Sequence, residues 1–186
     1  MGLAPDGNGV AGISDNGTGI FGKGAQFAGV FQGNVDVSGN ISCAQDIILK
    51  NADCAEDFEM SGAAPIEPGT VMVIDQEGAL QPSQQAYDKR VAGVISGAGD
   101  FRPGIVLDRQ QSQGNRMPIA LLGKVYCKVD AQFSSVEVGD LLTTSPTPGH
   151  GMKVIDPLKA FGAVIGKALH PLQSGQGLIP ILVALQ

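Results

Sequence analysis

The chain has 186 residues, 43% of them hydrophobic, and a net charge of −6. This charge argues against a general nucleic-acid-binding protein, which carries a basic patch or stripe. No apolar run approaches the ~18 residues of a membrane-spanning helix, and the start lacks the basic and apolar regions of a secretion signal. We therefore expect no nucleic-acid partner, no membrane insertion, and synthesis in the cytoplasm without a signal peptide.

The cysteines are odd in number and do not have the spacing of metal ligands. Cys43, Cys54 and Cys127 are separated by 11 and 73 residues, whereas cysteine metal sites place ligands two to four residues apart. We expect three free thiols of a protein made in a reducing cytoplasm. The sequence predicts no metal site and no cofactor.

A ten-residue period occupies the first part of the chain. A Gly precedes an apolar residue at Val10, Ile20 and Val30, and Phe21 and Phe31 add further apolar side chains. Fixed-period similarity is typical of repeat architectures. Each unit is interpreted as one short strand and one Gly turn. A hairpin is expected over 34–50, where Val35 and Val37 alternate with polar residues.

These units carry too few apolar side chains to fold in one copy. One or two anchors cannot offset about 1–2 kcal/mol of backbone ordering for each of ten residues. Identical copies wrapped around a shared axis would bury Val10, Ile20, Phe21, Val30 and Phe31 against one another. We predict an intertwined shaft over 1–50, in a homo-oligomer with threefold symmetry as the first choice. The alternative is a disordered Gly-rich linker.

From Pro65 onward the sequence predicts a compact β-domain. Its short apolar segments alternate with turn residues, and no helical pattern of ten or more residues occurs. The fold class is therefore mainly β, with a barrel or sandwich over 51–186. The expected strands are 71–74, 91–95, 105–107, 119–122, 124–130 and 179–185.

Two parts of this domain resemble each other. The segment 67–73 (EPGTVMV) matches 137–143 (EVGDLLT), and about 25 residues after each comes a Gly-containing apolar segment. This spacing predicts an internal duplication of one β-unit, covering 65–100 and 135–170.

The most acidic stretch lies where the Gly-rich part meets the β-domain. Residues 51–60 (NADCAEDFEM) hold four acids and no base. Such carboxylates can bind a hard cation, act as acid and base, or lie solvated on a surface. Close carboxylates would raise one another's pKa. Locally the stretch could form one helical turn or an extended segment.

The same stretch resembles a known family. Residues 51–59 (NADCAEDFE) are similar to the opening of a C-terminal domain of phage tail spikes and fibres, the G2-type autoproteolytic or intramolecular-chaperone domain. The resemblance implies a domain that brings three chains into register, some members of which cleave themselves. It implies that Asp53 and Glu56 form the acidic working pair, with cleavage close to Asn51.

Together these features predict a homotrimeric structural subunit of a phage tail fibre or a related injection-machine appendage. Units that look alike could slip by ten residues, so a domain that fixes register has a physical role. Expected partners are other copies of the chain and tail or baseplate proteins, on a virion or extracellular particle. Three alternatives stay open: a self-cleaving peptidase, a tip that binds a cell-surface glycan, and a ring- or filament-forming subunit.

Overall fold

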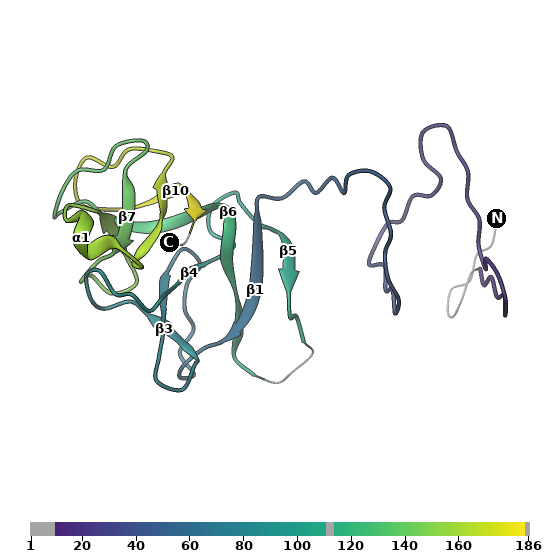
Figure 1. Ribbon diagram of the computed structural model, residues 1–186, viewed down its shortest axis with the longest axis horizontal. Coiled ribbons are helices and arrows are strands. Elements are labelled where there is room, and N and C mark those ends of the chain that lie inside the picture. The colour runs from purple at the N-terminus through teal and green to yellow at the C-terminus, as the bar shows by residue number, and fades with distance from the viewer. Residues whose placement is uncertain (1–9, 111–113, 185–186) are drawn as a thin grey trace. The chain divides into compact units, whose positions relative to one another are not determined.

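The computed structural model describes residues 10–110 and 114–184. The chain divides into two units, Met1–Ile47 and Ile48–Gln186 (Figure 1). Each unit is considered by itself.

The described residues of the first unit contain neither strand nor helix. The hairpin expected over 34–50 is therefore wrong for a single copy of the chain. Large apolar side chains from Val10 to Leu49 are 45–90% exposed. A two-stranded hairpin alone is at best marginally stable in water, and the large apolar side chains described in this segment are exposed in one copy.

The second unit is a β-domain with one short helix among its described residues. Its elements are β1 (Asp53–Glu59), β2 (Val71–Ile74), β3 (Leu80–Pro82), β4 (Val91–Ile95), β5 (Pro103–Leu107), β6 (Arg116–Asp130), β7 (Leu141–Thr144), β8 (Gly151–Lys153), α1 (Pro157–Ala160), β9 (Val164–Ala168) and β10 (Gln176–Ala184). The prediction of a mainly β fold is confirmed.

Five of these strands close into a barrel. The pairing runs from β6 to β8, β7, β9 and β10, and β10 pairs back onto β6 along Gln176–Ala184. On the other side of β6 lie β4, β2 and β3, and β1 pairs with β6 and β5. Closure removes free strand edges, which would otherwise bind other strands.

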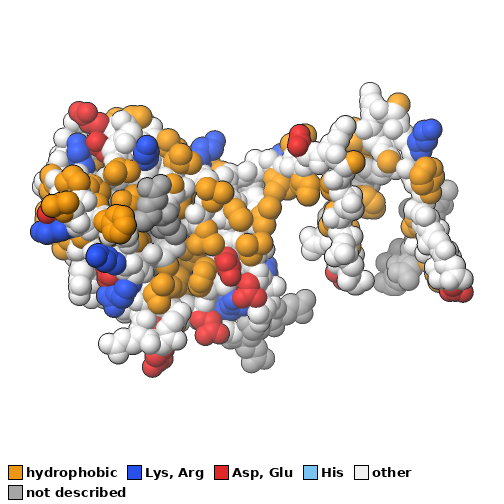
Figure 2. Space-filling model, viewed as in Figure 1, with side chains coloured by type: hydrophobic (Ala, Val, Ile, Leu, Met, Phe, Trp, Pro, Cys, Tyr) orange, Lys and Arg blue, Asp and Glu red, His pale blue; other side chains and the backbone are white. Residues whose placement is uncertain are grey.

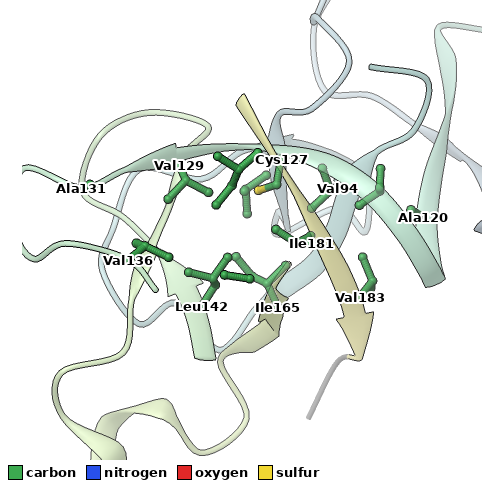
Figure 3. Packing of buried hydrophobic residues seen from close by; sticks show 14 residues of the cluster. Val94, Ala120, Cys127, Val129, Ala131, Val136, Leu142, Ile165, Ile181 and Val183 are labelled. Atoms are coloured by element: carbon green, nitrogen blue, oxygen red, sulfur yellow. The ribbon is translucent and has the colours of Figure 1, made fainter. Parts of the chain in front are cut away.

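The barrel is filled by branched aliphatic side chains (Figure 3). Val125, Cys127 and Val129 alternate along β6, and each is fully buried. They meet Ile181 and Val183 of β10 in one apolar cluster. Alternation places every second residue of a strand on one face, so the period of two in the sequence is what fills the barrel.

β6 is one strand where the sequence predicts two. It continues for 15 residues through Gly123, which has a φ of +107°. A Cβ atom at this position would lie 2.6 Å from the Ala52 carbonyl oxygen and 3.0 Å from the Asp53 Cα. Glycine therefore lets β6 bend in a conformation that costs other residues energy, and lets the start of β1 pack directly on it.

The two similar sequence segments have the same backbone arrangement. β2 pairs with β3 and β4, and β7 pairs with β8 and β9, all antiparallel. Gly69 (φ +88°) donates from its N–H to the Ile95 carbonyl, and Gly139 (φ +92°) donates to the Ala168 carbonyl, both at 2.8 Å. Similar sequences here accompany similar local folds.

Candidate functional site

The acidic stretch forms a strand at the start of the β-domain. β1 pairs in parallel with β5 and antiparallel with β6, so both of its edges are occupied. Of the two local conformations that the sequence allows, the extended one is present. The pairing partners hold the irregularities: β5 leaves Gly104 unpaired, and β6 leaves Leu121 unpaired.

Because β1 itself is regular, its side chains alternate between two faces. Asp53, Ala55 and Asp57 are buried, whereas Cys54 and Glu56 are only half-buried. Residues three apart on a regular strand point to opposite faces.

Asp53 lies inside the domain beside Ser96. Asp53 is only 5% exposed, and its Oδ1 accepts a hydrogen bond from the Ser96 hydroxyl at 3.0 Å. The second carboxyl oxygen, Oδ2, is buried and has no hydrogen-bond partner among the described residues. Burial raises the pKa of the Asp53 carboxyl, and the hydrogen bond from Ser96 opposes this rise. The Asp53 carboxyl therefore keeps its proton to a higher pH than a free aspartate does.

Glu56 belongs to the other face of β1. It lies opposite Ile119 of β6, whose side chain packs with Met72, Leu80 and Ile95 in a second apolar cluster. Its neighbour Ala55 lies opposite Ala120, which belongs to the barrel cluster. The structure thus separates the proposed acidic pair: within one chain, Asp53 and Glu56 do not share a face.

Asp57 is paired with an arginine that the sequence gives no reason to select. Arg109 donates to its carboxylate from Nε at 3.0 Å and from Nη2 at 3.3 Å. Arg116 donates to the backbone carbonyl of Asp57 and to the Asp108 carboxylate, both at 2.5 Å. Two of the four acids in the stretch, Asp53 and Asp57, therefore have internal structural partners rather than facing solvent.

The expected cleavage position, Asn51, is exposed just ahead of β1. The next residue, Ala52, donates from its N–H to the Arg102 carbonyl at 2.9 Å. Asn51 lines a polar cavity of about 220 Å³ together with Arg102 and Lys124 among other residues. The buried Asp53 does not line this cavity.

The residues expected on the oligomer axis are not in contact with a core. Val10, Ile20, Phe21, Val30 and Phe31 are 77%, 70%, 82%, 80% and 78% exposed. A single copy leaves them in water, as the low number of anchors per unit predicts.

Two further features bear on site chemistry. Among the described residues, no three His, Cys, Asp or Glu side chains are grouped so that they could hold a metal ion. No helix in the described part of the chain has the length and apolar character to span a bilayer.

Comparison with known proteins gives likenesses in structure alone. No protein-family model and no curated protein sequence matches the chain. The structure is similar to that of the pre-mature gene product 12 of bacteriophage phi29, with a TM-score of 0.59 and 16% sequence identity over 80% of this chain. It is less similar to the N base of the phi29 head fiber gp8.5, with a TM-score of 0.32 and 18% identity over 72% of this chain.

The first likeness shows a shared fold. The matching region covers 24% of gene product 12, so this chain spans about a quarter of that protein's length. The mainly β architecture described above is thus one that a phage protein also contains.

Proposed function

We propose that the chain is a structural subunit of a phage tail fibre or a related injection-machine appendage on a virion. In this assembly three copies associate through the Gly-rich segment 1–50, and the β-domain sets their register. Tail or baseplate proteins are the other partners, and a surface-binding tip is a role that the β-domain could add. The similarity to gene product 12 of phage phi29 supports the phage context.

The observation that carries this proposal is the exposure of the apolar side chains that recur every ten residues. Val10, Ile20 and Val30 are at least 70% exposed. Burying one such side chain stabilises a protein by about 1.5–3 kcal/mol. Other copies of the same chain offer the same spacing, so each apolar residue would meet its equivalents around an axis.

Native mass spectrometry of the full chain tests the proposal. We expect a trimer. A variant with Val10, Ile20 and Val30 all replaced by Ser should form much less trimer, since its shaft can no longer bury these apolar side chains. The matched control replaces Thr18, Gln26 and Gln32 by Ser, all exposed positions of the same segment, and should remain a trimer. A monomeric wild-type chain, or equal assembly of both variants, would contradict the proposal.

Self-cleavage near Asn51 is a second proposal, and Asp53 is the observation that favours it. A buried carboxyl with a raised pKa and a free oxygen is suited to general acid chemistry. Glu56 is on the opposite face of β1, so Asp53 alone takes the role in one chain. A lower-mass fragment that begins near residue 51, absent from the Asp53→Ala variant, would support cleavage. An intact mass after prolonged incubation of wild-type chain would exclude it.

A further inference from the structure

An apolar cavity lies beside α1, far along the chain from the acidic strand. It has a volume of about 430 Å³. Its lining is mostly apolar (Leu141, Val154, Pro157, Ala160, Phe161 and Val164) and also includes Gly139, Gly162 and the charged Asp140. This volume is within the range of pockets that bind organic ligands and large side chains. The position of α1 is fixed by its first turn, where the Asp156 side chain accepts a hydrogen bond from the Leu158 N–H at 3.1 Å.

Large apolar side chains around this cavity are exposed to solvent. Leu158 is 90% exposed, Phe161 85%, Val138 64% and Leu141 40%. We call these four residues and the cavity the α1 patch. Figure 2 shows hydrophobic side chains at the end of the domain that holds α1, interspersed with charged ones. Their exposure amounts to apolar area on the order of 500 Å², about the size of the largest apolar patch on an ordinary monomer, which is often functional.

The charges next to the α1 patch are balanced. The Nζ atom of Lys153 lies 2.8 Å from Oδ2 of Asp140, and Nζ of Lys159 lies 3.6 Å from Oδ2 of Asp156. Each pair contributes one charge of each sign, although the chain as a whole carries −6. A neutral apolar surface gives no preference for a polyanion or a polycation, and it does not repel a second surface identical to itself.

The α1 patch has both exposed apolar side chains and a cavity that could receive such side chains from another copy. Phe161 and Leu158 protrude, and the cavity beside them is large enough for an aromatic side chain. Two such patches in contact would bury on the order of 1,000 Å², the lower limit for a specific interface. A contact of that area would hold free domains together only weakly. It suffices when a shared shaft holds the domains at an effective concentration in the millimolar range.

We propose that the α1 patch is the contact between the β-domains of neighbouring copies of this chain. In this contact, Phe161 or Leu158 of one copy enters the cavity of another. The inference rests on the proposed function, because the shaft supplies the local concentration. It adds a second attachment between copies, which locks the domains after the shaft has associated.

Disulfide trapping in the full chain tests the contact. The background replaces Cys43 and Cys54 by Ser and keeps the buried Cys127. On this background we expect Leu158→Cys, combined with Leu141→Cys in the wall of the cavity, to give disulfide-linked chains when oxidised at low micromolar concentration. In the control, Gln84→Cys, at an exposed position that does not line the cavity, takes the place of Leu158→Cys and should give none.

Native mass spectrometry of the same reduced samples separates this inference from the proposed function. An oligomer whose Leu158→Cys chains link no better than the control overturns the α1 contact and leaves the shaft association standing. A monomer that does not link overturns both. An oligomer whose chains link only when they carry Leu158→Cys supports both.

A substitution and a dye give an independent test. Phe161→Asp should weaken the assembly at least tenfold, measured as the concentration for half-dissociation, with an unchanged melting profile of the domain because the side chain is 85% exposed. The assembled wild-type chain should bind little 8-anilinonaphthalene-1-sulfonate. Strong dye binding that Phe161→Asp abolishes, without any change in assembly, would show an open cavity for another ligand and overturn the contact.

Discussion

Asp53 and Ser96 meet inside the β-domain, 43 residues apart in the chain, through a 3.0 Å hydrogen bond from the serine hydroxyl to Oδ1. Asp53 begins β1 and Ser96 follows β4, so the bond joins the strand nearest the Gly-rich segment to the rest of the domain. The free Oδ2 beside it makes the charged form of Asp53 unfavourable. The protonation state of Asp53 therefore affects how stably β1 is attached to the rest of the β-domain.

The Asp53→Asn variant should be more stable than wild type at neutral pH. Because the folded-state pKa of Asp53 lies above its unfolded value, the folded state binds the proton more tightly. Its contribution to stability is then greatest at low pH and falls as pH rises through the raised pKa. Asparagine carries no charge, and its Oδ1 can still accept from Ser96.

Denaturant unfolding of both proteins from pH 3 to pH 8 checks this sign. The advantage of Asp53→Asn should shrink as pH falls toward the ordinary range for aspartate. An advantage that grows at low pH would mean that Asp53 is stabilised as a carboxylate, contrary to the burial argument.

Gly123→Ala should destabilise the domain by about 1–3 kcal/mol, since the added Cβ meets the backbone of residues 52 and 53 and φ is positive. Gly78→Ala is the matched control. Gly78 has a φ of +87°, but a Cβ there meets nothing within 4 Å. It should lose only the conformational part, roughly 1–2 kcal/mol. Thermal unfolding of the two variants measures the difference; equal losses would show that the close approach of β1 to Gly123 has no energetic weight.

Tyr87→Phe should loosen the segment before α1. The Tyr87 hydroxyl oxygen accepts hydrogen bonds from the N–H groups of Ile155 and Asp156, both at 3.0 Å. Removing this acceptor should cost about 0.5–1.5 kcal/mol, because Ile155 is exposed and water can replace part of the lost hydrogen bonding. Hydrogen exchange at residues 155 and 156 should accelerate. The control is Tyr126→Phe, whose hydroxyl has no hydrogen bond with the described residues and which should leave these two amides unchanged.

Cys127 should resist alkylation while Cys43 reacts. Burial raises the pKa of the Cys127 thiol to about 12, whereas Cys43 is exposed. The thiolate is the reactive form, so at pH 8 very little of Cys127 is available. Iodoacetamide labelling followed by peptide mass spectrometry should find Cys43 modified and Cys127 unmodified until denaturant is added. Rapid labelling of Cys127 under native conditions would indicate frequent opening of the barrel.

Alternation and continuous apolar runs predict five of the ten strands in the described part of the β-domain from sequence, namely β2, β4, β5, β6 and β10. Residues 91–95 and 71–74 are the strands expected there, because a buried strand needs little beyond a short apolar run. The division of β6 into two strands is wrong, since Gly123 marks a bend within a strand as well as a turn between strands. α1 is missed because four residues are too few for a helical period, although Asp156 and Pro157 are helix-start residues.

The sequence predicts less of the candidate site than of the fold. The acidic composition locates β1, and the resemblance selects Asp53. Nothing in the sequence links Asp53 to Ser96 or Asp57 to Arg109, because these pairs are brought together only when β1 joins strands formed much later in the chain. The separation of Asp53 from Glu56 follows from the period of two, but only once the stretch is known to be a strand.

The placement of β1 between β5 and β6 also sets an order of events during synthesis. Asp53 leaves the ribosome before Pro103 and Gly123, the residues with which it pairs. Because non-local strand pairs form only after the intervening chain exists, β1 stays unpaired while those segments are made. The Gly-rich segment that precedes it emerges earlier still, before the β-domain can fold. In the proposed assembly, the β-domain can therefore set the register between copies only after the segment up to residue 123 has been made.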